Sequence, residues 1–335
     1  RLIAELNHRR SQIELRPRTI FVGGGTPTFL RPEPWQQILA AMHSAGVLDQ
    51  VEEFTVEANP ETVTPQLMDI LVAGGVNRVS IGAQSFDPNL LKVLERWHEP
   101  ANVARAVHTI RDAGISNINL DLIFAIPGQP MARLDPELEH SLSLPPQHSS
   151  CYGLTYAPNT AMTQRLKMGL VTPMDEETEG RMYEHVMARL GREGFEHYEV
   201  SNWARPGRRC EHNLVYWNNG NWLGLGPAAA SHVEGWRWKN APHLGRYLSS
   251  DPEPPATDVE HLPAEQRVGE RLMLMLRLRE GAPLDWLRDH LPAGDARHAT
   301  IADLIAIAML ERTATHLRLT HRGLLVADSV IGKLL

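Results

Sequence analysis

The chain has 335 residues and a mass of 37.5 kDa, with 42% apolar and 22% charged residues, which excludes a disordered or fibrous protein. Its 33 Lys and Arg residues against 40 acidic residues give a net charge of −7, which argues against a general nucleic-acid binder. No apolar run approaches the roughly 20 residues of a membrane helix, and no signal-peptide core opens the sequence. We therefore expect a cytoplasmic protein.

The first half of the sequence alternates strand-like and helix-like segments. Short runs rich in β-branched and apolar residues predict strands at 19–23, 53–58, 78–82, 117–126 and 148–156. Helical periodicity predicts helices between them, at 34–46, 65–75, 100–114 and 131–142. Thr64 is the expected N-cap of the second of these helices, and Pro65 its first residue. This alternation is typical of a buried parallel sheet, either an open doubly wound sheet or a whole or partial barrel.

From about residue 163 the pattern changes. We predict a helix at 174–194, a strand at 196–202, and then a loop dense in Trp, Asn, Gly and His up to about residue 240. A Pro- and acid-rich linker at 250–263 precedes two amphipathic helices at 265–279 and 295–311 and a hairpin-like end at 317–328. The expected domains are a barrel core at 1–162, an extension at 163–249, the linker, and a small helical C-terminal domain of winged-helix type at 264–335.

Polar or conformationally special residues collect where the predicted strands end. They are Gly23–Thr26, Glu57, Asn59, Gln84, Ser85, Asp121 and Tyr152. Because ligands bind at the carboxyl ends of parallel strands, the set indicates a ligand site, although any one residue is equally well explained as a turn former or helix cap. The three glycines after the first strand allow a ligand to approach the backbone closely. They lack the spacing of a phosphate loop or of a dinucleotide fingerprint.

The order of these motifs resembles a known family. GGGTPT, a Glu-x-Asn-Pro strand end, RVSIGAQSF, Arg-x-His at 96–98 and NLDLIFAIPGQ follow one another as in the HemN/HemW group of radical S-adenosylmethionine (SAM) proteins, the anaerobic coproporphyrinogen III oxidase family. HYEVSN at 197–202 and HNLVYW at 212–217 look like the HemW branch, which is regarded as a group of haem chaperones. The resemblance covers nearly the whole chain. It implies an α/β fold with a partial (β/α)6 TIM-like barrel, SAM binding, haem binding and haem delivery to an acceptor protein.

The resemblance also implies a set of SAM-binding residues: Gly24, Gly25, Thr26, Glu57, Gln84, Arg96 and Asp121. The glycines and the threonine would hold the methionine amine, the glutamate would face the ribose, and the arginine would pair with the SAM carboxylate. The glutamine and the aspartate would complete the polar shell. If the family resemblance is set aside, an ion pair of Arg96 with Glu95 or Glu99 is the simpler interpretation of this arginine. Asp121 lies inside an apolar strand, so its carboxylate would be buried and needs a partner.

Radical SAM chemistry requires a [4Fe–4S] cluster, normally held by three thiolates in a C-x-x-x-C-x-x-C loop. Cys151 and Cys210 are distant from each other and have no such spacing, so this chain is expected to contain no cluster ligand and not to cleave SAM. We expect this cluster-binding loop to lie upstream of a helix at 2–14. Either truncation has removed the loop, which the start at Arg1 favours, or the chain is a natural relative that has lost it. Ala125 and the alanines at 228–230 replace residues that are often glycine in the family. Whether the chain is an enzyme stays open.

His212 is the predicted haem iron ligand, because neutral imidazole is a common axial ligand and the neighbouring Tyr216 and Trp217 suit a flat apolar macrocycle. Of the eight tryptophans, five lie between residues 203 and 238, which hints at a large planar ligand or a partner surface. From the residues alone, an extension that packs its aromatic side chains on the barrel explains the pattern better. Cys210 and His232 are rival ligands.

Two other functions stay open at this point. A radical SAM enzyme that decarboxylates porphyrinogen propionates would need the cluster loop, and a non-catalytic interaction module would retain only the fold. The expected partners are haem and an unidentified acceptor protein, with no nucleic acid and no transmembrane segment. A homodimer is one arrangement that the sequence leaves open.

Overall fold

A computed structural model of the protein describes residues 1–158 and 160–335. They form two compact units, each assembled from separate stretches of the chain. The barrel unit comprises Thr19–Gln37 and Glu52–Cys210, and the helical unit comprises Arg1–Arg18, Ile38–Val51 and Glu211–Leu335. The boundaries expected at 162, 249 and 263 stay predictions.

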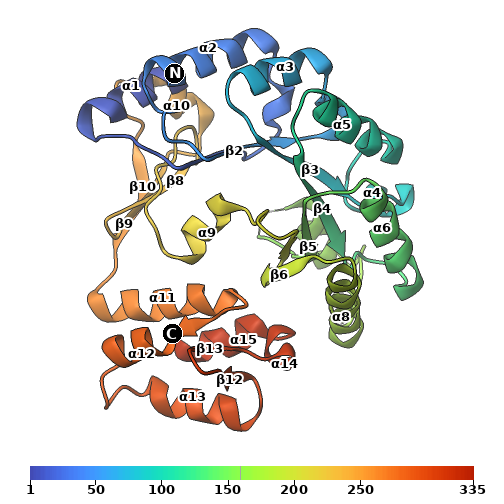
Figure 1. Cartoon of the computed structure of the whole chain (residues 1–335), viewed down its shortest axis with the longest axis vertical. Coiled ribbons are helices and arrows are strands. Elements are labelled where there is room, and N and C mark those ends of the chain that lie inside the picture. The colour runs from blue at the N-terminus through green and yellow to red at the C-terminus, as the bar shows by residue number, and fades with distance from the viewer. Residues whose placement is uncertain (159) are drawn as a thin grey trace. The chain divides into compact units, whose positions relative to one another are not determined.

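The barrel unit is built on a seven-stranded sheet in the order β1-β2-β3-β4-β5-β7-β6. The first five strands are parallel, namely β1 (Thr19–Val22), β2 (Glu53–Ala58), β3 (Arg78–Gln84), β4 (Asn117–Phe124) and β5 (His148–Gly153). The last two, β6 (Glu196–Glu199) and β7 (Asn202–Ala204), form an antiparallel pair, and β7 joins β5. The sheet curls into part of a barrel, which confirms the expected fold (Figure 1).

Helices connect these strands, and α3, α5, α6 and α8 line the outer side of the sheet (Figure 1). The helices of this unit are η1 (Pro27–Phe29), η2 (Pro60–Thr62), α3 (Pro65–Ala73), α4 (Pro88–Val93), α5 (Pro100–Asp112), α6 (Met131–Ser143), α7 (Ala161–Lys167) and α8 (Glu176–Arg192). Thr64 caps α3 as predicted, since its hydroxyl accepts the Leu67 N–H at 3.3 Å. Helix α2 (Pro32–Ser44) begins in the barrel unit and ends in the helical unit.

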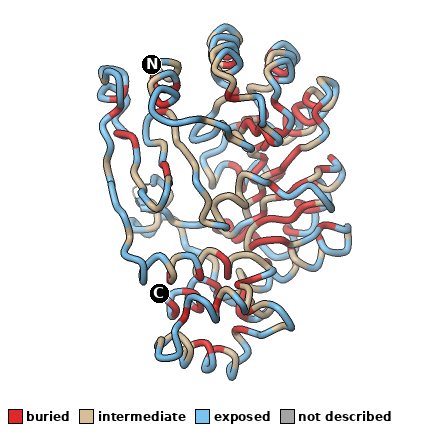
Figure 2. Tube along the Cα trace, turned by 60° about the vertical axis from the view of Figure 1, so that its left-hand side comes forward, coloured by how far each residue is buried: buried red, intermediate tan, exposed pale blue. Residues whose placement is uncertain are grey.

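Burial is concentrated along the strands of this sheet (Figure 2). Strands β2 and β3 are buried at all but one position each, as expected for the interior of a parallel sheet. Some of the buried side chains are nevertheless polar, among them Arg78, Asn119 and His148. Because buried polar groups need partners, these residues must form an internal network, which is described below.

The helical unit holds two three-stranded sheets, in the orders β10-β9-β8 and β11-β13-β12. Its strands are β8 (Ala230–Val233), β9 (Trp236–Asn240), β10 (Ala256–His261), β11 (Ala282–Pro283), β12 (Leu310–Arg312) and β13 (His316–Leu319). Its helices are α1 (Leu2–Gln12), α9 (Glu211–Trp217), α10 (Leu244–Ser249), α11 (Ala264–Arg277), α12 (Leu284–His290), α13 (Arg297–Ala306), α14 (His321–Leu324), α15 (Ala327–Ile331) and η3 (Gly332–Leu334). Helices α11 to α13 with the β12–β13 hairpin confirm the small C-terminal domain of winged-helix type.

Glu5 ties α1 into the helical unit, although its partners follow it by more than 200 residues. Its fully buried carboxylate accepts the Gly226 N–H at 3.0 Å, the Asn240 side-chain amide at 2.7 Å and the Tyr247 hydroxyl at 2.6 Å. Three donors satisfy this buried carboxylate, so α1 is an integral part of the unit. Among the helices that the structure describes, none has the length and apolarity needed to cross a membrane.

Three predicted segments differ from the structure. The loop expected up to residue 240 contains α9 and the β8–β9 hairpin, whose turn places both Glu234 (φ +51°) and Gly235 (φ +82°) in the left-handed region. A two-residue turn of this type normally carries Asn-Gly or Asp-Gly, so the Glu-Gly sequence did not predict a hairpin turn here. The expected linker contains β10, an exposed edge strand that pairs with β9. Residues 317–328 are not hairpin-like, because β13 pairs with the earlier β12 and two helices follow it.

Candidate functional site

The glycine loop after β1 lies against the carboxylate of Glu57 in β2. The Gly24 N–H donates to Glu57 Oε2 at 3.1 Å. A Cβ atom on Gly23 would lie 2.7 Å from that same oxygen, so any side chain there would displace the Glu57 carboxylate. Gly24 has a φ of +87° with open space around its Cα, and Gly25 and Thr26 are exposed beside it. The loop therefore places an exposed stretch of backbone next to a half-buried carboxylate.

Asp121 lies two strands away, on β4, and has the partners that its position in an apolar strand requires. The Asn119 side-chain amide donates to Asp121 Oδ1 at 2.6 Å, and the Ser80 hydroxyl donates to Oδ2 at 3.3 Å. Burial raises the pKa of Asp121, against the lowering effect of its hydrogen bonds. Burial also raises the pKa of Glu57, the Gly24 N–H lowers it, and the charge of Asp121 raises it further. The two carboxylates therefore belong to one electrostatic site.

The substitution Asp121→Asn is expected to stabilise the protein at pH 8 and to make no difference near pH 4. A raised pKa means that the native state holds a proton that the unfolded chain has lost, so the free energy of unfolding falls as pH rises from the ordinary value of 3.8 through the raised pKa. Asparagine removes that dependence and keeps an oxygen for the Asn119 amide. Urea denaturation at both pH values measures the difference. Equal destabilisation at pH 4 and pH 8 would contradict the expectation.

Gln84, Tyr152 and Arg96 form the other part of the site. The buried Gln84 ends β3 with a φ of +62°, and its Oε1 accepts the Tyr152 hydroxyl at 3.4 Å. Burial raises the pKa of Tyr152, the charges of Asp121 and Glu57 raise it further, and the charge of Arg96 lowers it. Arg96 is exposed and makes no ion pair among the described residues, so the pairing with Glu95 or Glu99 is not observed. Four of the predicted residues, Glu57, Gln84, Arg96 and Asp121, thus act on Tyr152.

Two contacts hold the β3 end in its unusual backbone conformation. Glu137 on α6 accepts the Ser85 hydroxyl at 2.8 Å and the Phe86 N–H at 2.7 Å. The His98 ring bonds the Ala83 carbonyl at 3.0 Å through Nε2. These contacts lie on either side of Gln84 in the sequence, so they fix the direction in which its side chain leaves the strand. His98 of the Arg-x-His motif is therefore a positioning residue for the site.

A buried network continues from Asp121 into the sheet. Asn119 Oδ1 accepts from His148 Nδ1 at 2.7 Å and from the Ser150 N–H at 3.0 Å. His148 Nε2 then accepts the Tyr198 hydroxyl at 2.8 Å. Burial holds the pKa of His148 well below its usual range, and the nearby charge of Arg78 lowers it further, so the ring is neutral. Asn119 and His148 were given no site role by the sequence, although Asn119 and Asp121 share one face of β4 through their spacing of two.

His212, the predicted haem ligand, lies on α9 in the helical unit. Its Nε2 is 2.8 Å from the Tyr216 hydroxyl, and its ring begins a series of aromatic contacts. Tyr216 packs edge-on against Trp222 with ring centroids 4.8 Å apart, and Trp222 packs at the same distance on His232. The rival ligand Cys210 belongs to the barrel unit, where it is fully buried and its thiol donates to Glu53 at 3.4 Å. That placement disfavours Cys210 as an iron ligand.

The described residues provide no metal centre. No group of three or more His, Cys, Asp or Glu side chains among them has the arrangement to hold a metal ion. Cys151 is buried, as predicted, and burial raises its pKa, which disfavours the thiolate form needed for metal binding. The chain contains two cysteines in all, so it does not supply the three thiolates of a radical SAM cluster.

Comparison with known proteins gives matches over almost the whole chain. Residues 5–139 match the radical SAM superfamily, and residues 262–326 match the HemN C-terminal domain. The chain is 36% identical over 319 residues to heme chaperone HemW of Mycobacterium tuberculosis, covering 95% of this chain and 80% of that protein. It is 32% identical over 320 residues to heme chaperone HemW of Lactococcus lactis, covering 95% and 84% respectively. For heme chaperone HemW of Escherichia coli the identity is 33% over 325 residues, covering 94% and 83%.

A solved structure shares the fold. Coproporphyrinogen III oxidase (HemN) from Escherichia coli, a radical SAM enzyme, superimposes with a TM-score of 0.84 at 18% sequence identity. The match covers 99% of this chain and 81% of that one. At this identity the similarity concerns the fold and not the reaction.

Proposed function

The chain belongs to the HemW family of radical SAM proteins, and on this premise we propose that it binds haem and passes it to an acceptor protein. The similarity to haem chaperones over 94–95% of the chain supports this function. The aromatic series that starts at His212 and ends at His232 is the observation that carries it. Edge-on and tilted aromatic rings between two imidazoles suit a flat apolar macrocycle whose iron needs a nitrogen ligand.

His212 is the proposed iron ligand. Its Nε2 lies 2.8 Å from the Tyr216 hydroxyl, within hydrogen-bond distance. An imidazole binds iron through a ring nitrogen that carries no proton, so His212 would coordinate in its neutral form. Tyr216 lies one helical turn after His212 on α9, so the short helix keeps the two side chains together.

We also propose that the barrel unit binds SAM through Gly24, Gly25, Thr26, Glu57, Gln84, Arg96 and Asp121. The open backbone at Gly24 fits the methionine amine, and the half-buried Glu57 carboxylate is suited to accept two ribose hydroxyls. Arg96 is not engaged in an ion pair with any described residue and fits the SAM carboxylate. In the superfamily, SAM bound to a reduced [4Fe–4S] cluster supplies an adenosyl radical. The cysteines of this chain do not fit that cluster, so its residues are assigned only the binding of SAM.

The substitution His212→Ala is expected to weaken haem binding about tenfold, because it removes the iron–nitrogen bond. Haemin titration followed at the Soret band measures the affinity. The matched control is His108→Ala, which removes an exposed histidine from α5 in the barrel unit. An unchanged affinity in His212→Ala would move the ligand to His232, and a wild-type chain without a Soret change would contradict the haem function.

The two alternatives predict different results. A coproporphyrinogen oxidase would convert coproporphyrinogen III to a decarboxylated product, whereas a chaperone would leave it unchanged. An interaction module would bind neither haem nor SAM. This proposal also includes transfer of haem to an acceptor protein, a homodimer and a cytoplasmic location.

A further inference from the structure

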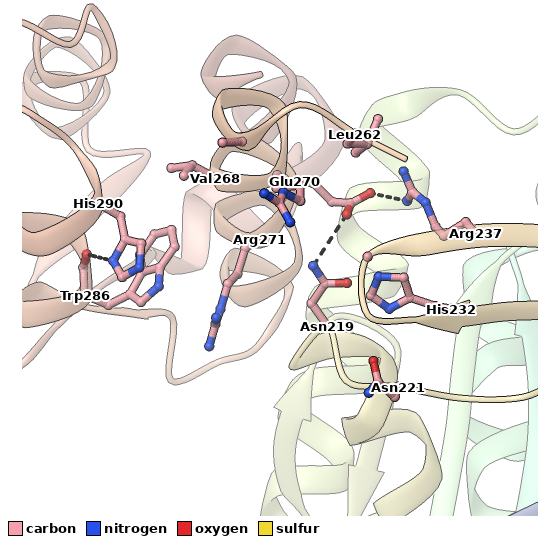
Figure 3. Close-up of a pocket in the computed structure, with 13 residues that line it drawn as sticks. Asn219, Asn221, His232, Arg237, Leu262, Val268, Glu270, Arg271, Trp286 and His290 are labelled. Atoms are coloured by element: carbon pink, nitrogen blue, oxygen red, sulfur yellow. Dashed lines mark hydrogen bonds and ion pairs between the residues drawn. The ribbon is translucent and has the colours of Figure 1, made fainter. Parts of the chain in front are cut away.

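A cavity of about 390 Å³ lies within the helical unit, where the β8–β9 hairpin faces helices α11 and α12 (Figure 3). His232 and Arg237 line it from the hairpin, and Asn219 and Asn221 line it from the segment that follows α9. The cavity therefore adjoins the end of the aromatic series, because His232 belongs to both.

The charges that line this cavity are mainly positive, in a chain whose net charge is −7. Arg237, Arg267 and Arg271 all line it, against a single carboxylate, Glu270. That carboxylate is already engaged, since it pairs with Arg237 and accepts the Asn219 amide at 3.4 Å (Figure 3). The cavity thus has cationic groups beyond those that its own acid neutralises.

Arg267 and Arg271 are the cations left over. Both are exposed, and neither forms an ion pair with any residue in the described part of the chain. They stand four residues apart on α11, so they project from the same side of the helix. Two like charges at this spacing repel each other, and an anion that bridges them would relieve the repulsion.

The wall beside these arginines is flat and aromatic. The Arg271 guanidinium lies 5.8 Å from the centre of the Trp286 ring, and Trp286 stacks on His290 at 4.6 Å (Figure 3). On the other side, His232 Nδ1 bonds the Gly220 carbonyl at 2.8 Å, which fixes the orientation of its ring. A ligand for this cavity should therefore combine a flat ring system with negative groups at its edge.

We propose that this cavity binds the two propionate carboxylates of the haem cargo, with Arg267 and Arg271 each pairing with one carboxylate. This inference rests on the proposed haem function. It deepens that function by assigning the polar edge of the macrocycle to α11. The planar guanidinium group forms two parallel hydrogen bonds with a carboxylate, which fits this task.

The test is a Soret titration of the full chain with haemin and with haemin dimethyl ester, in which both propionates are esterified. The double variant Arg267→Gln/Arg271→Gln is expected to bind haemin about tenfold more weakly than the wild type, because two solvent-exposed ion pairs are lost. The wild type is expected to bind the ester as weakly as the variant binds haemin, and the substitutions should not weaken ester binding further. The matched control is Arg288→Gln, an exposed arginine of α12 that does not line the cavity.

The outcomes separate this inference from the function on which it rests. If the double variant binds haemin like the wild type, or if the wild type binds ester and haemin equally, the cavity does not hold the propionates. If the wild type binds neither compound, the haem function fails and this inference fails with it. The ester comparison requires no substitution, so it also excludes a folding defect as the cause of weaker binding.

Discussion

Replacing Asn119 by alanine is expected to lower the free energy of unfolding by about 3–5 kcal/mol, a large effect for one side chain. Asn119 is almost fully buried and joins three strands of the sheet. Its amide donates to Asp121 at 2.6 Å, and its oxygen accepts from His148 at 2.7 Å. Alanine leaves these partners buried and unpaired, and each such group costs about 1–3 kcal/mol. Urea denaturation followed by circular dichroism measures the change.

The matched control for this substitution is Asn117→Ala. Asn117 lies two residues earlier on β4, on the same face, but its side-chain oxygen has no hydrogen-bond partner among the described residues. Its replacement is expected to cost less than about 1 kcal/mol. Similar losses for the two variants would show that the strand, and not the hydrogen-bond network, sets the effect.

The substitution Glu57→Ala is expected to weaken SAM binding about 100-fold, since two hydrogen bonds from ribose hydroxyls to a carboxylate contribute about 3 kcal/mol together. The same substitution removes the acceptor of the Gly24 N–H, which frees the glycine loop. Isothermal titration calorimetry with SAM measures the affinity. The two effects act in the same direction, so this is the residue of the proposed SAM site on which binding should depend most.

Glu61→Ala provides the control for Glu57→Ala. Glu61 lies in η2, just after the end of the strand that carries Glu57. Its carboxylate accepts hydrogen bonds from the Glu99 N–H and the Asn102 side-chain amide, and not from the glycine loop. We expect its loss to leave SAM affinity within about twofold of the wild type. Equal losses in the two variants, or tight binding by Glu57→Ala, would overturn the proposed role of Glu57.

The strands of the barrel could be predicted from the sequence because short runs rich in β-branched and apolar residues alternate with helical segments. The residues at their carboxyl ends could be predicted because the topology brings those ends together. His148 could not be assigned a role and the partners of Tyr152 could not be predicted, since both depend on the register between neighbouring strands. The pairing of β4 with β5 places Asn119 opposite His148, and no local pattern encodes that alignment.

The helical unit was harder to predict for two physical reasons. The turn of the β8–β9 hairpin uses Glu234 in the left-handed region, where asparagine or aspartate is usual, so the sequence carried no turn signal. The cationic cavity arises only when α11 and α12 face that hairpin, and neither segment is unusual alone. The pair His212 and Tyr216 was visible in the motif, but its geometry required the knowledge that residues 211–217 form a helix.

The contacts of Glu5 have a consequence for the synthesis of the protein. Tyr247 follows Glu5 by 242 residues, and a ribosome that adds about 5–20 residues per second takes on the order of 10 to 50 s to reach it. Throughout that time α1 has emerged without the donors that its buried carboxylate needs. The barrel unit is nearly continuous in the chain and can fold first, so α1 is made before the barrel unit but finds its native partners after it.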